Sequence, residues 1–212
     1  MPTPPNAAPL AGAGPTPRRA FADMTQALRE FLDKIVGARP DAATSADLSQ
    51  DLSRWSARLD DHQVDEREQY YARIYRAPGQ AQVTVPSFVL APGPDGDLRG
   101  QVTFGRFFLG WDGAAHGGAV ALLFDQILGQ TAAMSGGAAR TAYLNTNFRA
   151  LTPLDTPLDI RAWVERTEGR KRFARCELRH GEVLCADAEA LFVTVNVEAV
   201  SRRSPPPASA GR

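Results

Sequence analysis

One stretch constrains the fold of this chain more than any other: a glycine-rich loop that runs directly into an apolar segment, residues 113–129. Small and apolar residues recur there at helical spacing, which predicts a helix over residues 117–134. Most positions of this helix are apolar or small, so we expect it to be buried on nearly all sides.

Two features of the predicted helix indicate chemistry. Asp125 is a single carboxylate in the apolar run, and carboxylates are rarely fully buried unless they are paired or functional. Gly117 and Gly118 fall at the helix N-terminus, where free N–H groups and the helix dipole stabilise a carbonyl oxygen or an anion. An oxyanion-type site and an acid two turns away are parts that acyl transfer needs. The alternatives are a helix-entry turn and a structural acid paired with an arginine.

Composition narrows the classes of function. The chain has 212 residues with 24 basic and 24 acidic side chains and no polybasic cluster, so we expect no nucleic-acid partner. The longest apolar run, residues 119–123, is too short to span a bilayer, and no secretory signal is recognisable. These observations predict a cytoplasmic protein without a membrane span.

The two cysteines, Cys176 and Cys185, make no disulfide framework and no metal-ligand spacing, so we expect neither a metal nor another cofactor. If His180 and Gly181 form a two-residue hairpin turn, the cysteines face each other on paired strands. Two reduced thiols packed as small hydrophobic residues are the favoured interpretation in a cytoplasmic protein.

Composition and periodicity divide the chain into four parts. Amphipathic patterns predict one helix over residues 21–36 and a second that begins near Thr44 or Ser45, each covering part of a sheet or contacting a partner subunit. The parts are a disordered Pro/Ala-rich leader (1–19), a helical extension (20–76), the main domain (80–198) and a disordered tail (201–212).

The predicted strands complete an α+β fold in which a long antiparallel sheet wraps around the central helix. After the helix, β-branched and aromatic residues alternate with polar ones, as in an antiparallel sheet with one buried face. The expected strands are residues 83–85, 87–90, 101–109, 140–150, 157–168, 170–179 and 183–197.

Several motifs appear in a characteristic order: His-Gly-Gly at 116–118 with Asp-Gln-Ile-Leu-Gly at 125–129, then residues 140–149, 151–154, 168–171 and 192–196. In this order they resemble the PaaI-type acyl-CoA thioesterases of the hotdog-fold (4-hydroxybenzoyl-CoA thioesterase-like) superfamily, and among them the THEM-like subgroup. The resemblance covers residues 104–196. Gly110 replaces an Asn common in PaaI-type enzymes, and Trp111-Asp112 replaces the usual Pro-Pro.

The resemblance implies an acyl-CoA thioesterase and assigns four catalytic roles. The Gly117 N–H polarises the thioester carbonyl, and Asp125 is the general base or the nucleophile. Thr141 holds the attacking water. His116 hydrogen-bonds near the leaving sulfur, or only shapes the entry to the helix.

The resemblance also implies a homodimer, or a dimer of such dimers, with each site built across the interface. Nine residues of helix separate His116 from Asp125, roughly 13 Å, so one thioester cannot easily reach both ends. A two-fold partner solves this. The residues expected to bind the acyl-CoA substrate are Gly118, Trp111, Asn145, Arg149, Arg170 and Lys171, with Arg172 as a further candidate for the CoA phosphates and solvated surface charge as the alternative for each arginine and lysine.

Two other functions remain open. A hotdog hydratase or dehydratase would use an Asp-x-Asn-x-x-His loop, which the sequence lacks. A non-catalytic dimeric acyl-CoA-binding protein would need neither Asp125 nor Thr141, and the presence of both favours the hydrolase.

Overall fold

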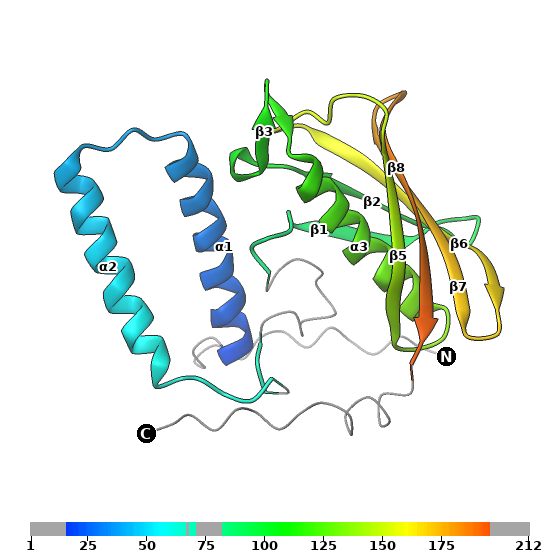
Figure 1. Ribbon diagram of the computed structural model, residues 1–212, viewed down its shortest axis with the longest axis horizontal. Helices are drawn as coiled ribbons and strands as arrows, with labels where there is room; N and C mark the ends of the chain where they lie inside the picture. The colour runs from blue at the N-terminus through cyan, green and yellow to red at the C-terminus, as the bar shows by residue number, and fades with distance from the viewer. Residues whose placement is uncertain (1–15, 67, 71–81, 196–212) are drawn as a thin grey trace, which may run out of the picture.

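The computed structural model describes residues 16–66, 68–70 and 82–195. A curved antiparallel sheet wraps around one helix, and two further helices lie to one side (Figure 1). The predicted α+β hotdog architecture with added N-terminal helices is confirmed. The helices are α1 (Pro17–Val36), α2 (Ala42–Asp60), the 3-10 helix η1 (Arg106–Phe108) and α3 (Gly117–Met134).

The main sheet has the order β1-β2-β6-β7-β8-β5, and every neighbouring pair is antiparallel. β5 lies at one edge, and a two-stranded ribbon, β3 and β4, leads into α3. The strands are β1 (Phe88–Pro92), β2 (Leu98–Thr103), β3 (Leu109–Trp111), β4 (Ala114–Ala115), β5 (Ala139–Phe148), β6 (Pro157–Glu168), β7 (Lys171–His180) and β8 (Val183–Thr194).

The helix α3 fills the concave face of the sheet because the sheet offers it small side chains. On β8, the inward positions Ala186, Ala188 and Ala190 are nearly inaccessible to solvent and let the helix backbone approach closely. α3 packs against the sheet with Phe124 and Leu128, both fully buried. The predicted helix over residues 117–134 is thus confirmed together with its central place.

Two strand predictions before α3 are wrong. Residues 83–85 form a turn and a bend, since Pro86, which has no N–H to donate, follows at once, although Val85 is fully buried. The predicted strand 101–109 splits, because β2 pairs with β6 only as far as Thr103, which lies opposite Pro157. Beyond it the chain turns into η1.

The hairpin between β7 and β8 does not pair the two cysteines. Its turn residues are Gly181 and Glu182, one position later than predicted, and Cys185 is the extra residue of a bulge in β8. Cys176 therefore lies opposite Ala188. Both cysteines are free and buried, and burial raises the pKa of the Cys176 thiol.

The N-terminal helices begin slightly earlier than predicted. α1 starts at Pro17, three residues inside the expected leader, because the Thr16 hydroxyl accepts the Arg19 N–H and proline suits the first turn. α2 starts at Ala42 because the Asp41 carboxylate caps it. Most of the leader and the whole predicted tail lie outside the described residues. No helix in the described ranges is long and apolar enough to cross a membrane.

Candidate active site

The N-terminus of α3 presents one free backbone donor. His116 is the N-cap, and its Nδ1 accepts the Gly118 N–H at 3.0 Å, while its carbonyl accepts the N–H groups of Ala119 and Val120. The Gly117 N–H has no acceptor among the described residues. Of the two glycine amides, only that of Gly117 is therefore available to a substrate oxygen.

The cap also fixes the chemistry of the His116 ring. A nitrogen that accepts a hydrogen bond carries no proton, so the neutral ring holds its proton on Nε2. His116 is exposed, and its Nε2–H is a donor that an incoming ligand can reach.

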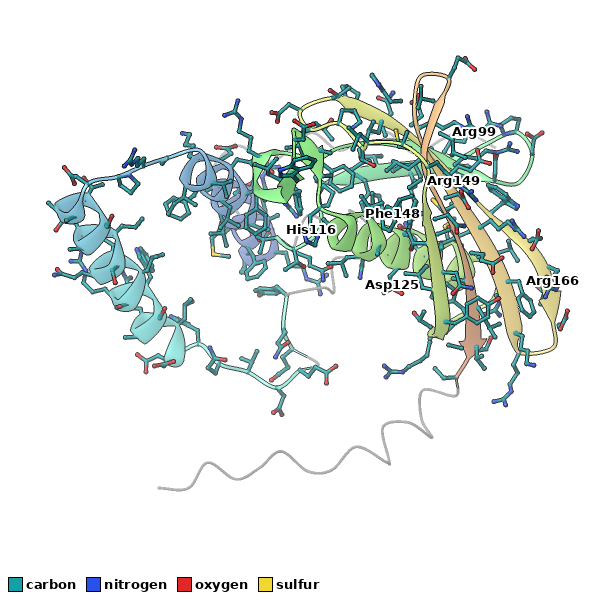
Figure 2. All side chains as sticks on the ribbon, turned by 45° about the horizontal axis from the view of Figure 1, so that its top comes forward. Arg99, His116, Asp125, Phe148, Arg149 and Arg166 are labelled. Carbon is teal, nitrogen blue, oxygen red and sulfur yellow. The ribbon has the colours of Figure 1, made fainter. Side chains whose placement is uncertain are left out.

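Phe148, at the end of β5, forms a wall beside the free donor. A Cβ added to Gly117 would lie 3.2 Å from the Phe148 ring, so glycine lets this aromatic side chain approach the helix N-terminus. Figure 2 shows Phe148 near His116. Phe148 was not among the residues that the sequence predicted for the site. The alternation of β5 could have found it, because Phe148 shares the inward parity of Leu144.

Asp125 lies two turns along α3 and is bound by Thr141. The Thr141 hydroxyl donates to Asp125 Oδ1 at 2.9 Å, which joins the helix to β5. The second carboxylate oxygen, Oδ2, has no partner among the described residues. The helix was expected to be buried on nearly all sides, but Asp125 is only half-buried, because the sheet covers only one side of α3.

Within one chain the free amide and the acid are far apart. Gly117 and Asp125 are eight residues apart on the same helix, or about 12 Å of rise at about 1.5 Å per residue. Figure 2 shows His116 and Asp125 at separate points along α3. One thioester carbonyl cannot contact both groups of a single chain.

Two hydrogen bonds hold the entry of α3 in place. The Asp33 carboxylate on α1 accepts the Phe107 N–H at 2.8 Å, and the Phe108 carbonyl accepts the His116 N–H at 2.7 Å. A Cβ on Gly110 would lie 2.8 Å from the His116 Cα, so glycine is required there.

Two of the expected substrate-binding residues lie near the helix entry. The Gly118 N–H is already bound by His116. Trp111 stands at the tip of the β3–β4 hairpin, where Asp112 and Gly113 both have positive φ, and its side chain is 82% exposed.

Asn145 and Arg149 engage partners on the outer face of the sheet, away from α3. Asn145 donates to Glu189 at 3.1 Å, and Arg149 pairs with Asp187 at 2.6 Å. Glu189 alternates with the buried Ala190 along β8, so this face points away from Asp125. The hydrogen bond from Arg149 lowers the pKa of Asp187 below its usual value.

The basic residues of the β6–β7 turn lie at the far end of α3. Arg172 is 6% exposed and donates from Nη2 to the Gly136 carbonyl at 2.8 Å, just beyond the helix C-terminus. It therefore anchors the helix and is not a surface contact for CoA phosphates. Arg170 and Lys171 are exposed. No cluster of side chains suited to a metal ion occurs in the described part of the chain.

Sequence comparison identifies relatives of the main domain. Residues 112–186 match the family model of the thioesterase superfamily. Acyl-coenzyme A thioesterase THEM4 of Bos taurus is 36% identical over 44% of this chain and 39% of its own length; THEM5 of Homo sapiens is 27% identical over the same shares. This chain thus spans less than half the length of these curated relatives.

A solved structure extends the likeness beyond the matched domain. The crystal structure of a thioesterase superfamily protein is 27% identical, with a TM-score of 0.71, and the match covers 89% of this chain and 94% of that one. Such coverage includes part of the N-terminal helical extension. The likeness of residues 112–186 to the thioesterase superfamily agrees with the hotdog fold around α3.

Proposed function

We propose that this protein is an acyl-CoA thioesterase that hydrolyses its substrate to a free acid and CoA. The observation that carries the proposal is the hydrogen bond from Thr141 to Asp125, on the same helix whose N-terminus offers the free Gly117 N–H. The first pair is suited to activate water, and the second group is suited to bind the oxyanion that forms.

The hydrogen-bond pattern supports a general-base mechanism. The Thr141 hydroxyl donates to Asp125, so its oxygen can accept a hydrogen bond from water while Oδ2 takes the other water proton. The hydroxide formed attacks the thioester carbon, and the oxyanion binds the Gly117 N–H. The C–S bond then breaks, and the proton held by Asp125 passes to the CoA thiolate, with the His116 Nε2–H as a nearby donor. Direct attack by Oδ2 is the alternative.

The separation of the two groups supports a homodimer. The face of α3 that carries Asp125 also carries Leu122 and Gln126, all half-buried, so the sheet of the same chain does not fully cover it. β5 is an edge strand with Tyr143 and Phe148 exposed. In a two-fold dimer closed over this face, the Gly117 amide of one protomer lies against Asp125 of the other.

The same two-fold arrangement gives Arg170 and Lys171 a role. They lie beyond the C-terminus of α3, the end that an antiparallel partner helix would bring near its own His116. Both side chains are exposed, whereas Arg172 is buried. We assign the CoA phosphates to this turn, contributed by the partner protomer.

Thiol release from a panel of acyl-CoAs tests the proposal. The wild type should hydrolyse part of the panel, and Asp125→Asn, which keeps the shape but cannot act as a base, should lose about a hundredfold or more in kcat. Asp112→Asn, an exposed carboxylate at a hairpin tip, is the matched control and should stay within about twofold. A wild type that binds CoA yet hydrolyses nothing would instead establish a non-catalytic acyl-CoA-binding protein.

A further inference from the structure

The helix α2 exposes a continuous apolar stripe. Its members recur every three or four residues along one face, and no residue of the helix is buried. The side chains of Leu52, Trp55 and Leu59 are 50%, 58% and 50% exposed, and Leu48 extends the stripe toward the N-terminus. Amphipathic helices owe most of their stability to packing of this face, so a 19-residue helix with no buried residue requires a partner.

The stripe borders an open groove. A hollow of about 600 Å³ separates α2 from the end of α1. Its α1 side is formed by Ile35 and Pro40, and its α2 side by the apolar Leu48 and Leu52 and by small serines. Small side chains along one flank allow another helix to approach closely. The residues that line the groove from α2 are Ser45, Leu48, Ser49, Leu52, Ser53 and Ser56.

The charges of α2 identify which helix would fit. The flank opposite the serines carries Asp47 and Asp51 in its first half and Arg54 and Arg58 in its second half. Such an acidic-then-basic order is complementary to itself when the helix is reversed. A two-fold axis perpendicular to two antiparallel helices keeps the same flank of each on the same side, so acidic and basic halves meet.

The apolar stripe has the same symmetry. When Leu52 lies opposite Trp55 of a second copy, Leu48 lies opposite Leu59 of that copy. In this register Asp47 is within two residues, about 3 Å of helical rise, of the position opposite Arg58 of the second copy. One register thus matches both the apolar and the charged positions.

We propose that α2 pairs antiparallel with α2 of a second copy of this chain. The contact is an isologous interface in which the Leu/Trp stripes pack together and the Asp and Arg halves of each charged flank meet. It lies in the N-terminal extension, apart from α3 and β5 (Figure 1). It therefore adds one association step to whatever assembly the main domain forms, and it does not depend on the proposed enzymatic activity.

A charge-swap experiment tests this pairing. Asp47→Arg/Asp51→Arg makes the flank basic, and Arg54→Asp/Arg58→Asp makes it acidic. Each variant alone should repel its own copy, so light scattering after size exclusion should show half the wild-type mass. An equimolar mixture should return to the wild-type mass, because a basic and an acidic helix attract. Asp23→Arg/Glu182→Arg, which raises the net charge by the same amount as the basic variant but at other sites, should keep the wild-type mass.

Two results would overturn the proposal. One is a wild type with the same mass as both charge variants, as expected if α2 folds back onto its own α1. The other is a loss of mass in each variant that mixing does not reverse, since a different partner or partial unfolding cannot be repaired by an oppositely charged copy. Circular dichroism of each variant verifies that helix content is retained. Trp55→Ala should weaken the association about tenfold or more.

Discussion

The helices α3 and α2 are almost equal in length, 18 and 19 residues, yet they lie in opposite environments. α3 fills the concave face of the sheet and buries seven of its residues, whereas α2 buries none. The difference follows from pattern: α3 is apolar or small at most positions, while α2 has a narrow apolar stripe between charged and serine flanks. Most of the broad apolar surface of α3 is covered by its own chain, whereas the narrow stripe of α2 is left bare, which is the basis of the proposed contact between chains.

The largest contrast should appear in the free energy of unfolding. Phe124→Ala removes a ring that is fully buried between α3 and the sheet, and should cost about 3–5 kcal/mol in urea denaturation. Leu59→Ala, the matched truncation on α2, should shift the main transition by less than about 0.5 kcal/mol when the protein is dilute. Equal losses in the two variants would mean that α2 is part of the central folding unit.

The next largest effect should be on kcat, at the side of α3 that the sheet does not cover. Thr141→Val preserves the shape of the side chain and removes the hydrogen bond to Asp125. We expect kcat for acyl-CoA hydrolysis to fall about 10- to 100-fold, the range for a lost hydrogen bond to a charged group, with KM nearly unchanged. Thr146→Val, on the same strand, is the control. A rise in KM at constant kcat would assign Thr141 to substrate binding instead.

The N-caps of the two helices allow a finer comparison. His116 caps α3 through Nδ1, and Asp41 caps α2 through its carboxylate. His116→Ala should cost about 1 kcal/mol of stability, and His116→Asn, which can accept the same N–H, much less. If the cap is the whole role of His116, the Asn variant also keeps full activity. A stable Asn variant with a large loss of kcat would show that the Nε2–H takes part in the reaction.

The elements that the sequence predicted well are those that bury a broad apolar face. Helical periodicity located α3 to the residue, and alternation located the four long strands, because each of these elements buries one extended apolar face. The Asp125–Thr141 pair was anticipated only through resemblance, since sixteen residues and a turn separate the two and nothing local sets their distance. The bulge at Cys185 depends on strand register, which is fixed by tertiary pairing. The hydrogen bonds that link Asp33 to η1 and η1 to His116 join segments that no local sequence pattern connects.

The two faces of the sheet repeat the contrast on a smaller scale, because α3 covers one face and partly exposed ion pairs hold the other. The pairing with Arg149 lowers the pKa of Asp187, so this carboxylate contributes stability that is present above its unfolded-state pKa of about 3.9 and is lost as pH falls through the lower folded-state value. Asp187→Asn should therefore be less stable than the wild type at pH 7, by at most about 1 kcal/mol, since the Arg149 side chain is 54% exposed.

The difference in the free energy of unfolding between Asp187→Asn and the wild type should shrink toward zero below about pH 4. There the Asp187 carboxyl is neutral in the unfolded chain and increasingly neutral in the folded one, as the asparagine is at every pH. Arg149→Gln should produce the same pH dependence and leave KM for acyl-CoA unchanged, because its guanidinium is bound on the face away from Asp125. Urea denaturation between pH 3 and 7 measures the first effect, and steady-state kinetics the second. A KM raised about tenfold in Arg149→Gln would instead put this arginine on the CoA phosphates and extend the site around the edge strand β5.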